Sequence, residues 1–218
     1  VVAGSVRGDR GVCANYACAM KIKLTYFDVK ARGEPIRIAL RHAHVPFEDH
    51  RITFAEWQAL KPTVPSRALP LLEIDDEAYS QSVAIARWAG KLSDLYPSDP
   101  VAALKVDEVC DIAQELLTKT PSSPDDDEKK RLRTEYAAGP MKDKMALLAS
   151  KVVGPFLLGD EISIGDLVLF YFLLDMLRSG NFDYVPADYV DAYPALAKLE
   201  AAVTASPLLA EDYPGPYY

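Results

Sequence analysis

The order of strand and helix patterns in residues 21–92 constrains the fold of this chain more than any other feature. Its first segment alternates apolar and polar residues, with Ile22, Leu24 and Tyr26 on one side, and this period of two is typical of a β-strand. Glu34-Pro35 then begins a pattern with helical spacing, because proline fits the first turn of a helix. We expect a strand from residue 21, a helix over 34–44, strands over 47–52, 69–74 and 78–79, and a helix over 82–92. This order predicts an α+β layer with a small mixed sheet.

The rest of the chain predicts only helices. Residues 93–100 contain Asp, Ser and two prolines and are expected to link two domains. An apolar stripe predicts a helix over 102–119, which a polar, proline-containing loop ends. Further helices are expected over 128–152, 163–178 and 189–205. The predicted domains are therefore residues 20–92 and an all-helical domain, residues 101–218.

A helix start signal lies in the second domain. Ser163 and Asp166 have the S-x-x-D spacing of a capping box, and an apolar run follows them. We expect the Asp166 carboxylate to reach back to the amide of Ser163, and Asp166 to matter for folding rather than for chemistry.

Residues 1–19 do not resemble the segment that follows them. They mix Gly, Ser, Arg, Asp and Cys without a periodic apolar face, and Met20 stands directly before the first strand. We expect the native chain to begin at Met20, with residues 1–19 an extension or residues introduced by cloning that are dispensable. A short targeting peptide is the alternative.

Charge and apolar content exclude two classes of protein. The chain has 24 basic and 32 acidic residues in 218, a net charge of −8, and a nucleic-acid-binding surface needs the opposite sign. No apolar run approaches the roughly 18 residues that a membrane span requires. The acid excess lies in residues 93–218, with 22 acidic and 11 basic residues, whereas residues 21–92 have 9 and 11. An anionic small substrate therefore suits the first domain better, although the acidic half also favours simple solubility.

Six segments, in order along the expected elements, carry a resemblance to a known family. They are Leu24-Thr25-Tyr26-Phe27, Gly33-Glu34-Pro35-Ile36-Arg37, Glu48-Asp49-His50-Arg51, Trp57 through Lys61, Leu69-Pro70-Leu71-Leu72-Glu73 and Gln81-Ser82-Val83-Ala84-Ile85-Ala86-Arg87. Together they resemble the cytosolic glutathione transferases, in the sigma-like, tyrosine-type group that includes glutathione-dependent prostaglandin D synthases. The resemblance implies a thioredoxin-like α+β domain followed by an all-helical domain. It also implies glutathione as a substrate and a cytoplasmic homodimer.

A tyrosine at the end of the first strand suits the chemistry of a thiol substrate. A thiol with a pKa near ~8.5 is mostly protonated at pH 7, yet the thiolate is the nucleophile. A phenol with a pKa of ~10 stays protonated, and its hydrogen bond stabilises the anion more than the neutral thiol. The resemblance makes Tyr26 this donor and places Arg32 beside it. From the residues alone, a packed tyrosine and a surface arginine are the alternatives.

The resemblance also assigns the contacts that hold glutathione. Trp57 and Lys61, four residues apart on a short helix, would bind the glycyl carboxylate. Leu69-Pro70 would have a cis peptide bond and present the backbone of Leu69 to the cysteinyl residue. Gln81-Ser82 lies where a strand meets a helix, with Ser82 the expected N-cap, and would receive the γ-glutamyl carboxylate at the helix N-terminus.

Three further assignments and two departures complete the comparison with the family. Glu115 matches an acidic residue that the partner subunit places near the γ-glutamyl amine, and Phe27 and Val29 are candidates for the acceptor pocket. Arg67-Ala68 replaces the usual Gly-Lys or Gly-Gln, which removes one side-chain contact to glutathione. Ser66 replaces an aromatic residue that would plug into a partner, so a polar, flat dimer interface is expected.

The expected function is conjugation of glutathione to hydrophobic, electrophilic small molecules, as in detoxification, without a metal. One alternative is a glutathione-dependent isomerase of the prostaglandin D synthase type. Another is a non-catalytic binding protein, such as a ligandin or a crystallin. A cysteine-based mechanism on the same fold is not favoured, because Cys18 precedes the first strand and Cys110 falls on a helix of the second domain.

Overall fold

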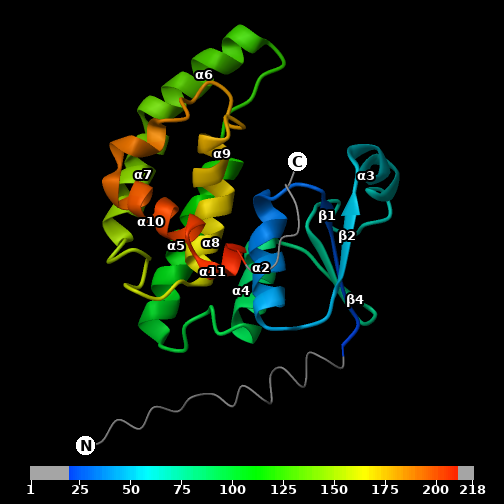
Figure 1. Ribbon diagram of the computed structural model, residues 1–218. Helices are drawn as coiled ribbons and strands as arrows, with labels where there is room; N and C mark the ends of the chain where they lie inside the picture. Colours follow the sequence, from blue (N-terminus) through cyan, green and yellow to red (C-terminus); the bar gives the residue numbers. More distant parts are fainter. Residues whose placement is uncertain (1–19, 211–218) are drawn as a thin grey trace, which may run out of the picture.

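The computed structural model describes residues 20–210 (Figure 1), so the predicted extension at residues 1–19 lies outside the described part, as do residues 211–218. The first half forms a four-stranded sheet with the order β2-β1-β3-β4. Its strands are β1 (Ile22–Phe27), β2 (Glu48–Ile52), β3 (Leu71–Ile74) and β4 (Glu77–Tyr79). The β1–β2 pair is parallel and the β1–β3 and β3–β4 pairs are antiparallel, which confirms the mixed sheet.

Four helical segments accompany the sheet: the 3₁₀ turn η1 (Ala31–Gly33), α2 (Glu34–His42), α3 (Phe54–Leu60) and α4 (Ser82–Leu92). Helices α2 and α4 pack against each other. Figure 1 shows them between the sheet and the helices of the second half, with α3 beyond β2. Pro35 lies in the first turn of α2, where its missing N–H leaves no helical hydrogen bond unmade.

The second half is helical, as predicted. Its elements are α5 (Pro100–Thr118), α6 (Asp126–Ala138), α7 (Pro140–Lys151), α8 (Ile164–Leu169), the π-helical turn η2 (Phe170–Leu174), α9 (Asp175–Arg178), the 3₁₀ turn η3 (Tyr189–Ala192), α10 (Pro194–Thr204) and α11 (Pro207–Ala210). Between residues 100 and 210, the only strand-like pairing is an isolated bridge from Phe156 to Gly159.

Three predicted helices differ from the observed ones. The helix expected over 128–152 is two helices, because Pro140 cannot donate a backbone hydrogen bond and Gly139 leaves helical geometry with φ −121° and ψ −100°. The segment 163–178 contains the π-helical turn η2. The segment 189–205 opens as a 3₁₀ turn before α10, which begins at Pro194.

Two details of the β3–β4 hairpin also differ from the prediction. Strand β3 begins at Leu71 rather than at residue 69, because Pro70 lacks the N–H that a strand pairing requires. Glu77, which was expected in the turn, is the first residue of β4. The turn itself is Asp75-Asp76, and Asp75 has a φ of +53° that short polar side chains tolerate.

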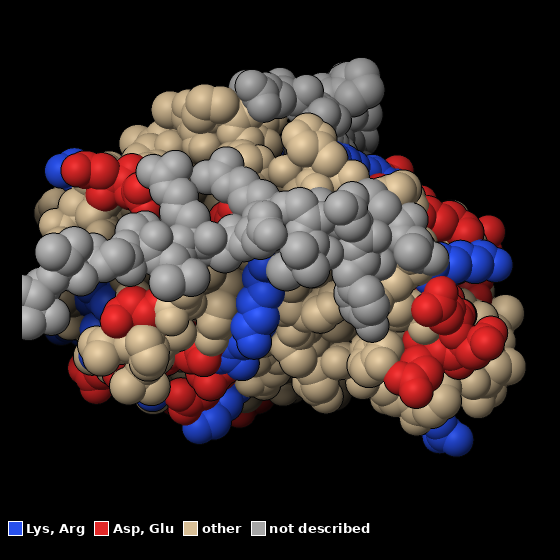
Figure 2. Space-filling model, turned by 90° about the horizontal axis from the view of Figure 1, so that it is seen from below, with Lys and Arg blue, Asp and Glu red and all other residues tan. Residues whose placement is uncertain are grey.

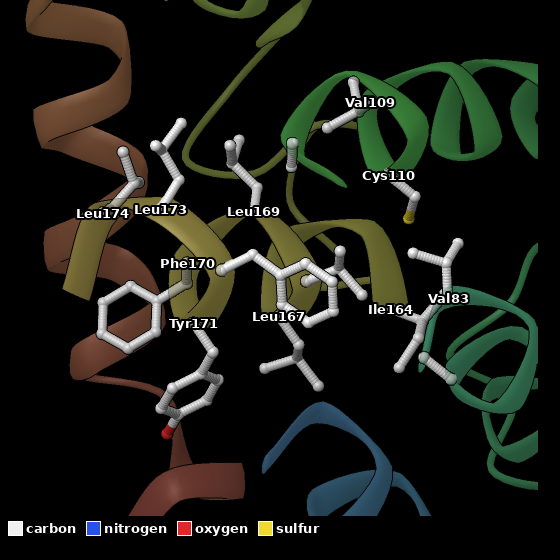
Figure 3. Close-up of a cluster of buried hydrophobic side chains, with 14 of the residues drawn as sticks. Val83, Val109, Cys110, Ile164, Leu167, Leu169, Phe170, Tyr171, Leu173 and Leu174 are labelled. Atoms are coloured by element: carbon white, nitrogen blue, oxygen red, sulfur yellow. The ribbon is translucent and has the colours of Figure 1, made fainter. Parts of the chain in front are cut away.

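One large apolar cluster joins the two halves of the molecule. Figure 3 shows its centre, where Ile164 of α8 lies near Val83 of α4 and Cys110 of α5, and Leu167 of α8 points toward α2. A second cluster is much smaller and lies beside α3; its buried members are Ile52, Trp57, Val64 and Leu71. We call these the main core and the α3 cluster.

The predicted box at the start of α8 lies inside the main core. Asp166 is fully buried, and its carboxylate accepts hydrogen bonds from the amides of Ser163 and Leu157, both at 2.8 Å. The Ser163 hydroxyl donates to the same carboxylate at 2.6 Å. Burial raises the pKa of Asp166, and these hydrogen bonds oppose the rise. Asp166 therefore holds the amide of Ser163, as the sequence predicted, and it also ties the preceding loop at Leu157 to the helix.

Candidate active site

Tyr26, the predicted catalytic residue, is the penultimate residue of β1 and is only 6% exposed. Its ring lies against the backbone of Gly33 in η1, where a Cβ atom would come within 2.5 Å of the ring carbon Cδ1. On the Arg37 side, the guanidinium carbon lies 5.7 Å from the ring centroid. The position after Arg32 therefore requires glycine for space, and the ring is fixed by its neighbours.

Burial raises the pKa of the Tyr26 phenol. The backbone N–H of Arg32 and the positive charges of Arg32 and Arg37 act in the opposite direction, but they do not cancel the effect of burial. Arg32 is half-buried beside the phenol, and this burial lowers the pKa of its guanidinium. The phenol is therefore protonated at neutral pH and able to donate a hydrogen bond, and Arg32 lies where it was predicted.

The pairing of the strands brings the other predicted residues to the same sheet edge. The β1–β3 register ends at Thr25 opposite Leu71, so the chain continues with Tyr26 next to Pro70. The β3–β4 register pairs Leu72 with Tyr79, which places the following residues, including Gln81, beside Pro70. Strand β2 runs parallel to β1 and ends at Ile52, so α3 begins at this edge too.

Helix α3 carries Trp57 and Lys61 and starts at a complete capping box. The Thr53 hydroxyl accepts from the amide of Glu56 at 3.2 Å, and the Glu56 carboxylate accepts from the amide of Thr53 at 2.7 Å. Trp57 is 8% exposed and packs in the α3 cluster. Lys61 follows the last helical residue, is exposed, and donates its amide to the carbonyl of Trp57. Both side chains thus come from one short, well-capped turn of chain.

The remaining predicted contacts lie at the starts of β3 and α4. The Leu69-Pro70 peptide bond is cis, as the resemblance implied. Pro70 is buried, and Leu69 packs at the margin of the α3 cluster. Ser82 was predicted to be the N-cap of α4, but this is wrong: Gln81 holds that position with φ +78°, and Ser82 is the first helical residue. The side chain of Gln81 makes no capping hydrogen bond, so the first N–H groups of α4 have no side-chain acceptor at the N-cap.

Glu115 and the two acceptor-pocket candidates lie elsewhere or are otherwise engaged. Glu115 is on α5 and accepts from Lys119 at 2.6 Å and Lys144 at 2.8 Å, and these lysines lower the pKa of its carboxyl to about 2. The Phe27 ring stacks on Phe54 with centroids 4.4 Å apart and joins the α3 cluster. Val29 is 42% exposed, in the loop after β1.

Arg37 is the functional candidate that sequence reasoning missed. It is fully buried in α2, directly behind Tyr26. The available signal was a pair of charged residues, Glu34 and Arg37, spaced by three on a helix that otherwise packs apolar side chains. Spacing alone predicts a surface ion pair, and only the fold shows that both residues are enclosed.

Cys110, the one cysteine in the described part of the chain, lies on α5. Burial raises the pKa of the Cys110 thiol to about 12, so this side chain is not a nucleophile at neutral pH; Cys13 and Cys18 lie outside the described part. Residues 20–210 contain no group of three His, Cys, Asp or Glu side chains placed to hold a metal ion. A cavity of about 650 Å³ between β3, β4 and α4 includes Ile74, Tyr79 and Trp88 in its wall but none of the predicted site residues.

Two surface properties of the described part bear on partners. On the face seen in Figure 2, acidic and basic side chains are interspersed, and its described residues form no continuous basic patch. Among residues 20–210, no helix has the length and apolar character needed to cross a membrane.

Comparison with known proteins gives one consistent answer. Residues 111–211 match the family model for the glutathione S-transferase C-terminal domain. Among curated proteins, the chain is 32% identical to hematopoietic prostaglandin D synthase of Gallus gallus, over 86% of this chain and 92% of that protein. It is 30% identical to glutathione S-transferase 4 of Caenorhabditis elegans, over 74% and 83%.

Solved structures agree in fold. Rat hPGDS in complex with a quinoline has a TM-score of 0.76 and 26% identity, over 87% of this chain and 94% of that one. Prostaglandin synthase D of Nilaparvata lugens has a TM-score of 0.75 and 29% identity, over 90% of this chain and all of the other. With a matching fold and identities of 30% or more over most of the curated relatives' length, the chain belongs to the glutathione S-transferase family.

Proposed function

We propose that this protein is a glutathione transferase in which the Tyr26 hydroxyl activates the substrate thiol for attack on electrophilic small molecules. The observation that carries this proposal is a buried, protonated phenol at a sheet edge. Strand register brings Pro70 and Gln81 to the same edge. Helix α3, which carries Trp57, also begins there.

The chemical step follows from the phenol's state. Tyr26 donates a hydrogen bond to the sulfur of bound glutathione, which favours loss of the thiol proton to solvent. With a chloronitroaromatic acceptor, the thiolate forms a carbon–sulfur bond and chloride departs with the electron pair of the carbon–chlorine bond. With an enal, the thiolate adds to the β-carbon, and the resulting enolate takes up a proton from solvent. Arg32, half-buried beside the phenol, adds positive charge where the anion develops.

We assign the rest of the glutathione molecule to the residues gathered at the same edge. The Trp57 indole N–H and the Lys61 ammonium donate to the glycyl carboxylate. Leu69, before the cis Pro70, presents its backbone to the cysteinyl residue. Gln81 and Ser82 receive the γ-glutamyl carboxylate at the uncapped start of α4.

Several features of the proposal concern the assembly and its setting. We propose a cytoplasmic homodimer of chains that each comprise a glutathione-binding domain, residues 20–92, and a helical domain, residues 101–218. In this dimer Glu115 of one subunit would approach the γ-glutamyl amine bound by the other. Detoxification of hydrophobic electrophiles is the proposed role, with Phe27 and Val29 nearest the acceptor.

One alternative is supported by the names of the relatives. Several similar proteins are prostaglandin D synthases, which suggests an isomerase that uses glutathione without consuming it. A non-catalytic binding protein is a second alternative, and the set of polar residues at the sheet edge speaks against it.

An activity screen separates these functions. We expect turnover with glutathione and a chloronitroaromatic, enal or hydroperoxide acceptor, and a Tyr26→Phe variant that loses at least about tenfold in turnover at neutral pH. Glutathione-dependent conversion of a prostaglandin endoperoxide alone would favour the isomerase. Binding without turnover on any of these substrates would contradict the proposal.

A further inference from the structure

Arg37 is the most completely enclosed charged side chain near the site. It is 0% exposed in α2, and it donates to two backbone carbonyls: to Phe27, the last residue of β1, at 3.0 Å from Nη2, and to Val29 in the following loop at 2.9 Å from Nη1. It also donates to Asp49 of β2 at 2.9 Å from Nε and to Glu34 at 3.2 Å from Nη1. One guanidinium thus joins β2, α2 and the loop that follows Tyr26.

These contacts have a geometric consequence for the phenol. The carbonyl of Phe27 belongs to the residue next to Tyr26, so its hydrogen bond fixes the backbone on the C-terminal side of the ring. Gly33 leaves no space on its own side of the ring, since a Cβ there would lie 2.5 Å from Cδ1. The Arg37 guanidinium lies 5.7 Å from the ring centroid and adds a favourable cation–π contact.

The planar fork of arginine is essential to this arrangement. Lysine has the same charge but presents it as a single flexible point, so it cannot bridge two carbonyls and two carboxylates at once. A buried guanidinium lowers the stability of a protein unless its N–H donors are paired. Each of the three guanidinium nitrogens of Arg37 has a hydrogen-bond partner. The enclosure of Arg37 is therefore tied to the conformation of the β1–η1 loop.

We propose that Arg37 is a positioning residue for catalysis, which holds the Tyr26 ring and the loop after it so that the phenol hydroxyl meets the bound thiol. This inference rests on the proposed role of Tyr26. Arg37 does not touch glutathione in this account and acts only through Tyr26.

The test is an Arg37→Lys variant, with the ionisation of bound glutathione followed by thiolate absorbance across pH. We expect the pKa of the bound thiol to rise toward that of the free thiol, and turnover near pH 7 to fall about fivefold or more. The Michaelis constant for glutathione should stay within about twofold, because the binding contacts are made by other side chains.

Two comparisons separate positioning from general loss of stability. Arg87→Lys weakens a partly buried ion pair with Asp107 and Asp111, far along the chain from the loop, and should leave the thiol titration unchanged. A Tyr26→Phe/Arg37→Lys double variant should titrate like Tyr26→Phe alone, because a residue that acts through the phenol has no effect once the hydroxyl is gone. Additive shifts in the double variant would overturn the inference.

A milder variant keeps the test valid if Arg37→Lys does not fold. Asp49→Asn removes the charged partner of the Arg37 Nε, together with the ion pairs from Asp49 to Arg41 and Arg51. The Asp49 side chain is 20% exposed, so the protein should fold with a smaller shift of the thiol pKa in the same direction. A wild-type titration curve in this variant would overturn the role of Arg37. If instead the wild-type protein itself shows no lowered thiol pKa, the proposed function fails, and the two failures are thereby distinguished.

Discussion

The main core and the α3 cluster differ in size and in what they support. The main core extends from β1 and α2 through α4 into α5, α8 and α10, and it encloses Asp166. The α3 cluster has four buried members and contains Trp57, with Leu69 at its edge. Most residues that stabilise the fold therefore lie in one cluster, whereas two proposed glutathione contacts lie in the other. Tyr26 belongs to neither and is held between Gly33 and Arg37.

The difference suggests how binding and stability are divided. A segment with few buried apolar contacts opens locally at a lower free energy than the global unfolding of the domain. We therefore expect the α3 segment to open before the main core, and glutathione to stabilise the closed segment by mass action. Mutations in the two regions should then separate stability from affinity.

Asp166→Ala should cause the largest loss of stability. The change leaves the buried amides of Ser163 and Leu157 without acceptors and removes the helix cap. We expect a loss of about 3 kcal/mol, or a fall of roughly 6–12 °C in melting temperature, with near-normal glutathione affinity in the folded protein. Calorimetry measures the melting temperature, and a binding titration measures the glutathione affinity. The exposed Asp160 in the preceding loop is the control, and equal melting temperatures for Asp166→Ala and Asp160→Ala would refute the role of the box.

Gly33→Ala should lower both the stability of the protein and its turnover. The new Cβ would overlap the Tyr26 ring, so we expect about 1–3 kcal/mol of destabilisation from overpacking. Displacement of the ring should also lower turnover by about tenfold or more, measured under saturating glutathione. At Gly139 a Cβ meets only a backbone oxygen at 3.4 Å, so Gly139→Ala serves as the control. Wild-type turnover in Gly33→Ala would mean that the ring position does not matter.

Lys61→Glu should change affinity with little change in stability. Lys61 is exposed, and the variant would place a carboxylate beside the glycyl carboxylate of glutathione. The Michaelis constant for glutathione should rise severalfold while the melting temperature stays the same. Lys142→Glu, at an exposed position in α7, makes the same charge change elsewhere. If both variants have the wild-type constant, Lys61 is a solvated surface residue.

Glu115→Gln should also have little effect on stability. Its ion pairs with Lys119 and Lys144 are at the surface, where such pairs contribute little. The melting temperature should stay close to that of the wild type. A severalfold rise in the Michaelis constant for glutathione would support its proposed action across the dimer, and an unchanged constant would remove Glu115 from the site.

The sequence was most informative about features that depend on a local pattern within a single strand or helix. Alternation at Ile22, Leu24 and Tyr26 predicted β1, and the helix over 82–92 was found within the predicted bounds. The Asp166 box was also predictable, because its spacing is local. The resemblance to the family added the cis bond before Pro70, which no local pattern favours.

The features that were not predicted depend on tertiary packing or on backbone angles. The N-cap of α4 is Gln81 rather than Ser82 because of its left-handed φ, which glutamine seldom adopts. The π-helical turn at Phe170–Leu174 packs on η1, a contact that spacing does not reveal. The break before Pro140 did have a signal, because proline lacks the backbone N–H that a continuing helix needs and Gly139 precedes it.

The central claim is that the Tyr26 hydroxyl stabilises the thiolate of bound glutathione, and titration of that thiolate tests it most directly. Thiolate absorbance should be followed across pH in the wild-type complex and in Tyr26→Phe, which keeps the ring and removes only the donor. We predict a bound thiol pKa well below the ~8.5 of a free thiol in the wild type and close to that value in the variant. Glutathione should still bind to Tyr26→Phe, because its other contacts remain. Identical titration curves for the two proteins would contradict the tyrosine mechanism.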